Sequence, residues 1–186
     1  MTSRIVPPSV THAAADLITG ATWNSGLATP VSFLTGVPMF AGYSKTSVSV
    51  ASPANPSAGP FVSIPMDGTL ADTDNGHSNV TNNTRYTCQV AGWYLVSGTI
   101  AWTVSSVGER YTQLALNGAY VVSSGAAAPA TGFLTGVPMQ QILVPMNVTD
   151  YVELQGAQDS GAALNTYPGV GGSQGCYLSL FWVSSL

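Results

Sequence analysis

The chain of 186 residues is long enough for one domain with an appendage, or for two small domains. Only 6% of its residues are charged, four basic and eight acidic, which excludes the basic surface of a nucleic-acid-binding protein. Hydrophobic residues make up 45%, which argues against a charged, disordered chain, and no apolar run approaches the roughly 20 residues that span a bilayer.

The first 41 residues differ in texture from the rest and are predicted to form an N-terminal arm. Pro7 and Pro8 favour an extended or turning lead-in, and a helix of at most two turns is expected over residues 12–18. Gly20 can close this helix, because glycine readily adopts the left-handed conformation that ends helices. The opening stretch has too short an apolar run and too many prolines for a secretory signal, so we expect synthesis in a cytosol.

The second half of the arm is apolar, but no period would bury its side chains on one local face. Its prolines are expected to hold much of the segment extended. Two interpretations stay open: the segment wraps around its own domain, or it docks on a partner and becomes ordered there. Under the second interpretation, the partner-binding residues of the arm are Pro7, Pro8, Trp23, Leu27, Phe33, Leu34 and Phe40.

The remainder, residues 42–186, has the texture of an all-β domain in which short alternating segments are separated by turn formers. A turn at Asn117-Gly118 predicts a strand pair within residues 110–122. Residues 67–84 are expected to form a polar loop, and small residues predict another loop over residues 123–132. About eight to ten antiparallel strands without a convincing helix predict a sandwich of the jelly-roll type. Further strands are expected within residues 45–51, 61–66, 141–156 and 176–186.

The longest two-residue period lies in the stretch 85–104 and predicts the central strand, launched by a turn at Gly92. Polar residues such as Ser97 and Thr99 occupy the opposite parity, as expected where one face packs on a core. Trp102 is assigned to the buried side. The apolar parity comprises Tyr94, Val96, Ile100, Trp102 and Val104.

Two further features leave alternatives open. Cys88 and Cys176 both lie in predicted strands and are either joined in a disulfide or buried as free thiols. The heptapeptide FLTGVPM occurs at residues 33–39 and again at 133–139. The two copies either occupy equivalent grooves on neighbouring subunits or reflect a local duplication without a shared role.

The groups that carry out chemistry are scarce. The histidines His12 and His77 lie outside any nucleophile motif, and no paired carboxylates can be identified for glycoside hydrolysis. Asp72, Asp74 and Asn75 offer hard oxygen ligands for calcium, but their spacing differs from that of a calcium-binding loop, and a polar turn is the alternative. We therefore expect no catalytic residue, no cofactor and no metal.

Several motifs are spread over about residues 48–186: Tyr86, Cys88, Gly92, Tyr94 and Val96, then Leu116, Asn117 and Gly118, then Asp150, Val152 and Leu154, and last the strand 176–182. Together they resemble the globular head of the complement and tumour-necrosis-factor superfamily. The resemblance implies a ten-stranded jelly roll that forms compact homotrimers. The polar run 72–82 and the apolar arm look more like the versions carried by tailed phages of actinobacteria. No collagen repeat, signal or membrane anchor is seen, so cytokine and complement roles are not expected.

The resemblance implies a non-enzymatic virion protein, made in the host bacterial cytoplasm. The favoured function is a trimeric decoration protein attached through its arm to the major capsid protein or another virion protein, without nucleic acid or membrane. The alternative is a minor tail or fibre-tip protein that adheres to host-surface carbohydrate. Leu178, Leu180 and Trp182 share the inward parity of the last strand. Tyr177 and Phe181 on its other face, with Tyr151, are therefore expected at the trimer interface.

Overall fold

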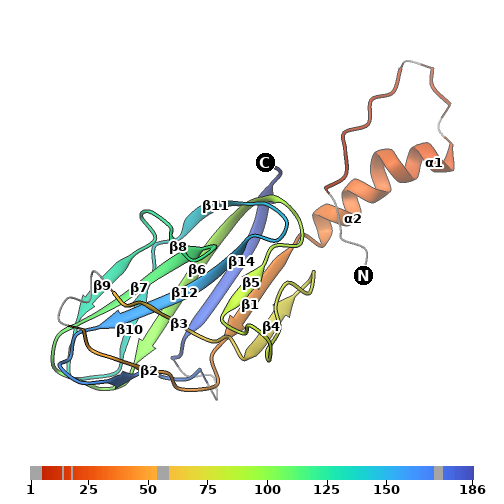
Figure 1. The fold of residues 1–186 in the computed structure, drawn as a ribbon. Coiled ribbons are helices and arrows are strands. Elements are labelled where there is room, and N and C mark those ends of the chain that lie inside the picture. Colours follow the sequence, from red (N-terminus) through yellow and green to blue (C-terminus); the bar gives the residue numbers. More distant parts are fainter. Residues whose placement is uncertain (1–5, 14, 18, 54–58, 170–173) are drawn as a thin grey trace.

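The computed structural model describes residues 6–13, 15–17, 19–53, 59–169 and 174–186. These residues form an all-β jelly-roll sandwich with a partly helical N-terminal arm, as the sequence predicted (Figure 1). The described residues form more strands than the eight to ten expected, because several are only two residues long. The strands are β1 (Met39–Tyr43), β2 (Ser49–Val50), β3 (Val62–Ser63), β4 (Gly68–Asp72), β5 (Arg85–Thr87), β6 (Gly92–Trp102), β7 (Glu109–Leu116), β8 (Ala119–Tyr120), β9 (Ala126–Pro129), β10 (Thr135–Pro138), β11 (Ile142–Met146), β12 (Tyr151–Gln158), β13 (Leu164–Asn165) and β14 (Tyr177–Ser184).

Two six-stranded antiparallel sheets make up the two layers. The first, which we call the β6 sheet, has the order β10-β6-β14-β1-β4, with β11 also paired to β6. The second, the β12 sheet, has the order β3-β12-β7-β8, with β5 paired to β12 and β9 to β7. Strands β2 and β13 form a separate small pair. Strands far apart in the sequence, such as β1 and β14, are therefore direct neighbours.

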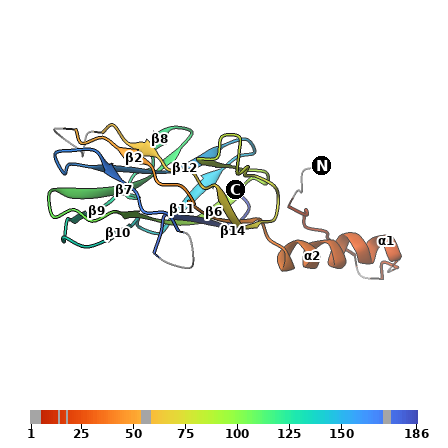
Figure 2. The same cartoon turned by 90° about the horizontal axis from the view of Figure 1, so that it is seen from below.

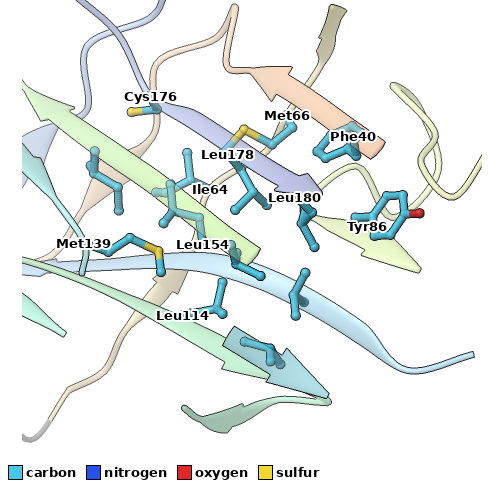
Figure 3. Close-up of a cluster of buried hydrophobic side chains, with 14 of the residues drawn as sticks. Phe40, Ile64, Met66, Tyr86, Leu114, Met139, Leu154, Cys176, Leu178 and Leu180 are labelled. Carbon is cyan, nitrogen blue, oxygen red and sulfur yellow. The ribbon is translucent and has the colours of Figure 1, made fainter. Parts of the chain in front are cut away.

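The core lies between these sheets and is built from the inward parity of each long strand (Figure 3). Leu178 and Leu180 of β14 meet Leu154 of β12 and Leu114 of β7, and all four side chains are fully buried. Trp102 is also fully buried, as its parity predicted. This burial of apolar area is the main source of the stability of the head.

Strand β6 is central, as predicted, because it pairs with β10, β11 and β14. The predicted stretch 85–104 is nevertheless divided. Its first part, β5, belongs to the β12 sheet, so the chain crosses between layers before Gly92. Its last residue, Val104, lies beyond the strand and is exposed, so its assignment to the buried row was wrong.

The turn at Asn117-Gly118 is confirmed, with positive φ angles of 51° and 80° that join β7 to β8. Two expected loops contain strands instead. Strand β4 lies within residues 67–84, and β9 lies within residues 123–132. Neither segment alternates clearly in hydrophobicity, so only pairing with neighbours reveals them as strands.

The arm contains one helix in three consecutive segments, α1 (Gly20–Trp23), a π-helical turn (Asn24–Ala28) and α2 (Thr29–Thr35). Figure 2 shows it extending beyond the end of the sandwich. The expected helix over residues 12–18 is absent from its described residues, and residues 14 and 18 lie outside the described part. Ala15 has φ of 75°, which no right-handed helix accepts, and Gly20 begins the observed helix instead of closing one.

The expectation that prolines keep this segment extended was wrong for Pro30, which lies in the first turn of α2. Thr29 donates its backbone N–H to the carbonyl of Asn24, five residues earlier, which widens the turn just before the proline. A proline ring normally collides with the carbonyl four residues before it, and the wider turn provides room for it. The helix therefore continues through a residue that usually ends one.

Candidate functional site

The helix of the arm exposes a row of apolar side chains, which we call the arm stripe: Trp23, Leu27, Val31 and Leu34. Their spacing of three or four residues keeps side chains on one side of a helix. Between 44% and 66% of each is exposed. No charged residue occurs between Leu17 and Ser44. The arm stripe is thus an apolar surface that the head leaves uncovered.

Phe33 joins the arm to the head. It is only 5% exposed, and its ring meets Trp182 of β14 edge-on, with the ring centroids 4.9 Å apart. The indole N–H of Trp182 donates to the carbonyl of Ala91 at 3.2 Å, which fixes the ring that Phe33 contacts. Phe33 was predicted to bind a partner, and the structure places it against its own head instead.

The prediction that Phe40 is a partner-binding residue of the arm was wrong. It lies in β1, is fully buried, and stacks on Tyr86 with the ring centroids 5.3 Å apart. Its side chain is part of the core of the head and is therefore inaccessible to a partner. Because β1 begins at Met39, the sandwich also begins before the predicted boundary at residue 42.

The two N-terminal prolines lie in the irregular segment that precedes the helix. Pro7 is partly buried and Pro8 is exposed. This segment passes close to the π-helical turn, because a Cβ at Gly26 would come within 3.2 Å of the Nε2 of His12. The structure brings Trp23, Leu27 and Leu34 onto one helix and leaves Pro7 and Pro8 outside regular structure.

A second apolar surface covers the outer face of the β6 sheet, the face turned away from the core. The pairing register aligns Leu143, Leu95, Phe181 and Met39 across β11, β6, β14 and β1. Phe181 is 46% exposed and Leu143 is 50% exposed. Tyr177 lies on the same face of β14, four residues from Phe181, so the structure brings these two predicted interface residues together.

The outer face of the β12 sheet is polar along β12. Gln113 donates from its side-chain amide to the Oε1 of Gln155 at 3.0 Å, and Thr84 donates to the Oε1 of Glu153 at 2.6 Å. Tyr151 lies on this sheet, with the guanidinium of Arg85 4.5 Å from its ring centroid. Tyr151 is therefore in the opposite layer from Tyr177 and Phe181.

Antiparallel sheets usually have one face on the core and one face in water, and the β12 sheet follows this rule. The outer face of the β6 sheet carries an exposed apolar row beside Ser97, Thr99 and Ser179, and an exposed apolar row is typical of a surface that a partner covers. The sequence contained the signal, since Trp93 and Leu95 occupy the supposedly polar parity of the central strand. Only the register showed that Leu143 and Met39 extend this row.

Two of the polar residues considered for chemistry, Asp72 and His77, hold the loop between β4 and β5 in place. The ring nitrogens of His77 lie 2.8 Å from the carbonyl oxygen of Arg85 and 2.6 Å from that of Met66. Asp72 accepts from the backbone N–H groups of Gly76 and His77 at 3.0 Å each. Asp72 and His77 thus take part in a polar turn. Among the described residues, no group of three or more His, Cys, Asp or Glu side chains is placed to hold a metal ion.

Both cysteines are free and fully buried, which agrees with the second of the two interpretations. Burial raises the pKa of the Cys88 thiol, and it raises the pKa of Cys176 to about 11. A thiol attacks as its thiolate, so both groups are held in their unreactive form at neutral pH. They act as small apolar side chains in the core.

No protein-family model and no curated protein matches this sequence. Among solved structures, the chain is similar to murine APRIL at pH 5.0, with a TM-score of 0.55 and 8% identity over 78% of this chain and 98% of that one. Eiger TNF from S. frugiperda gives 0.52 and 12%, over 80% of this chain and 94% of that one. The PRD1 vertex protein P5 gives 0.51 and 14%, over 79% of this chain and 97% of that one. At such identities the likeness shows the fold alone. No helix among the described residues is long and apolar enough to cross a membrane.

Proposed function

We propose that this chain is a non-enzymatic structural protein of a phage virion, which assembles as a homotrimer and decorates the capsid. Its arm fastens it to the major capsid protein or to another virion protein. The likeness in fold to a phage vertex protein supports the setting. The observation that carries the proposal is the arm stripe on a charge-free helix that projects from the head (Figure 2).

The helix has weak intrinsic stability. It contains Gly20, Gly26 and Pro30, together with several β-branched residues, all of which are poor helix formers. Helices of this length are marginal in water even when the sequence favours them. Within residues 20–35 only Phe33 is buried by the chain itself. A surface that covers the arm stripe would supply further stabilisation, as when an amphipathic helix binds an apolar groove.

The trimer is proposed to form through the outer face of the β6 sheet. This face has apolar side chains on adjacent strands, and Tyr177 and Phe181 are the predicted interface residues that lie on it in β14. The Oγ atoms of Ser97 and Ser179 on this face lie 2.9 Å apart, so these two hydroxyls keep a hydrogen bond when the face is covered. Tyr151 is a less favourable candidate, because it lies in the other sheet, on β12, where the outward side chains are polar.

The experiment that tests the arm uses particles assembled without this protein. The double variant Trp23→Ser/Leu27→Ser removes half of the arm stripe, and each half-exposed side chain should contribute about 1 to 1.5 kcal/mol on burial. We expect occupancy on particles to fall at least tenfold, while the thermal stability and mass of the free protein stay unchanged. Occupancy would be measured by sedimenting the particles and quantifying the bound chain.

The matched control is Val10→Ser/Leu17→Ser, which removes two exposed apolar side chains of the arm outside its helix. It should bind particles as the wild type does. Full occupancy of the Trp23→Ser/Leu27→Ser variant would place the anchor in the head and would contradict the proposal. Because no charged residue occurs between Leu17 and Ser44, attachment should also survive high salt.

A second candidate function is adhesion to host-surface carbohydrate at a tail or fibre tip. One observation favours it, an aromatic hollow on the outer face of the β12 sheet. The number of copies per virion separates the two candidates, because a capsid decoration protein is present in hundreds of copies and a tail-tip adhesin in few.

A further inference from the structure

A hollow of about 520 Å³ lies over β7, beside the edge along which β8 and β9 pair with that strand. This volume falls within the range of small-molecule sites in proteins. Three of its lining residues are aromatic, and small residues leave space between their rings. A side-chain amide adds a polar group. The residues that matter for the argument are Phe61, Tyr111, Gln113, Tyr120, Gly125 and Ala126.

The aromatic walls are held in place by neighbouring groups. The hydroxyl of Tyr111 donates to the carboxylate of Glu109, and this hydrogen bond, with some desolvation, raises the pKa of Tyr111 to about 12. The ring of Tyr120 rests on Gly125, where an added Cβ would come within 3.1 Å of its hydroxyl oxygen. Half of the Tyr120 side chain is nevertheless exposed, so its ring is available to a ligand.

Gln113 supplies the polar contact. One of its amide N–H groups is bound to Gln155, as described above. Among the described residues, its own carbonyl oxygen accepts no hydrogen bond, so the amide retains both an acceptor and a second donor. This leaves a polar group beside aromatic surfaces that can hydrogen-bond to a ligand hydroxyl.

The chemistry of the lining restricts the ligand. None of the lining residues is acidic or basic, which disfavours phosphorylated ligands and ions. A peptide strand cannot be added here, because the backbone of β7 is already paired with β9 and β8 on one side and with β12 on the other. The remaining ligand class has flat apolar faces and a rim of neutral hydroxyls, and these are the properties of a sugar ring.

We propose that this hollow is a binding site for a neutral saccharide, which stacks on Tyr120 and hydrogen-bonds to Gln113. The site lies in the layer opposite the apolar face of the β6 sheet. The inference deepens the second candidate function, and it rests on that candidate alone. Its test needs no particle, so a negative result leaves the test of the arm unaffected.

The experiment uses the full chain and saturation-transfer NMR with four probes: methyl β-glucoside, methyl β-galactoside, methyl α-mannoside and N-acetylglucosamine. A shallow site for one sugar ring should bind at least one probe with a dissociation constant on the order of 1 mM. Tyr120→Ala and Gln113→Ala should each weaken that binding at least fivefold. Both side chains lie outside the core, so the melting temperature should be retained.

Val122→Ala is the matched control, because Val122 is exposed two residues beyond Tyr120 and does not line the hollow. It should bind the probe as the wild type does. Failure of all four probes at roughly 50 mM would overturn the proposal. Equal binding by Tyr120→Ala would also overturn it, since the sugar would then bind elsewhere. Binding of indole at the hollow without any sugar would show an apolar site instead.

Discussion

Replacing Phe181 with alanine should weaken the proposed trimer without disturbing the fold. Phe181 lies at the centre of the apolar row on the outer face of the β6 sheet, and 46% of its surface is exposed in the single chain. That fraction corresponds to roughly 90 Å² of an aromatic side chain. At about 25 cal/mol per Å², covering it contributes about 2 kcal/mol for each protomer and about 6 kcal/mol for a trimer.

The concentration at which half of a trimer dissociates varies with the square root of its dissociation constant. A loss of about 6 kcal/mol should therefore raise that concentration about 100-fold. Sedimentation equilibrium over a dilution series measures this shift directly. Val122→Ala serves as the control, because Val122 is 75% exposed in a loop that follows β8 of the other sheet.

Two results would refute the reasoning. Light scattering that gives the mass of a monomer for the wild-type chain at micromolar concentration would exclude the trimer itself. A trimer whose dissociation is equally insensitive to Phe181→Ala and Val122→Ala would place the interface on a different surface. Unchanged thermal unfolding of the dissociated variant is the check that Phe181 lies outside the core.

Trp102→Ala should lower the free energy of unfolding by about 3 to 5 kcal/mol, since the side chain is fully buried. Trp102→Phe should lower it far less. Equal effects of the two substitutions in denaturant titrations would contradict the packing of Trp102 in the core. The amide of Asn117 and further hydrogen bonds hold the pKa of Asp150 below its usual range. The stability that these bonds contribute is present above the unfolded pKa of about 4, and it is lost as the pH falls through the lower folded pKa. The melting temperature of Asp150→Asn should therefore be lower than that of the wild type at pH 7, and it should fall less when the pH is lowered. Cys88 and Cys176 should resist Ellman's reagent until the protein unfolds, and rapid labelling of the native chain would contradict their burial.

The repeated heptapeptide FLTGVPM shows why local sequence could predict only part of this fold. In residues 33–39 it ends α2 and enters β1, with Phe33 buried. In residues 133–139 it forms β10, with Phe133 exposed and Val137 buried. The same seven residues adopt different conformations because different neighbours cover them, so the two copies do not occupy equivalent places in the fold.

Predictions succeeded where a period extended over many residues. Strand β6 alternates for most of its length, and its buried row was assigned correctly from parity as far as Trp102. Strand β9 consists of three alanines and a proline, which give no alternation, and it exists because β7 offers backbone partners. In the arm, Trp23, Leu27 and Leu34 share one side of a helix that was not predicted, because Gly26 and Pro30 are poor helix formers and the π-helical turn that accommodates Pro30 leaves no sequence signal.

The two proposed surfaces depend on each other. Each arm leaves the head beside the last strand, where Phe33 meets Trp182, so threefold symmetry would place three arms at the same end of the assembly (Figures 1 and 2). One half-exposed arm stripe offers only a few kcal/mol, most of which is lost in ordering the helix. Once one arm is bound, the other two meet their sites at a high effective concentration, and the combined affinity rises by orders of magnitude. Arms that bind weakly one by one therefore give tight attachment only when a trimer presents three of them. A Phe181 variant that dissociates into monomers should for this reason also be released from the particle, although its arm is intact.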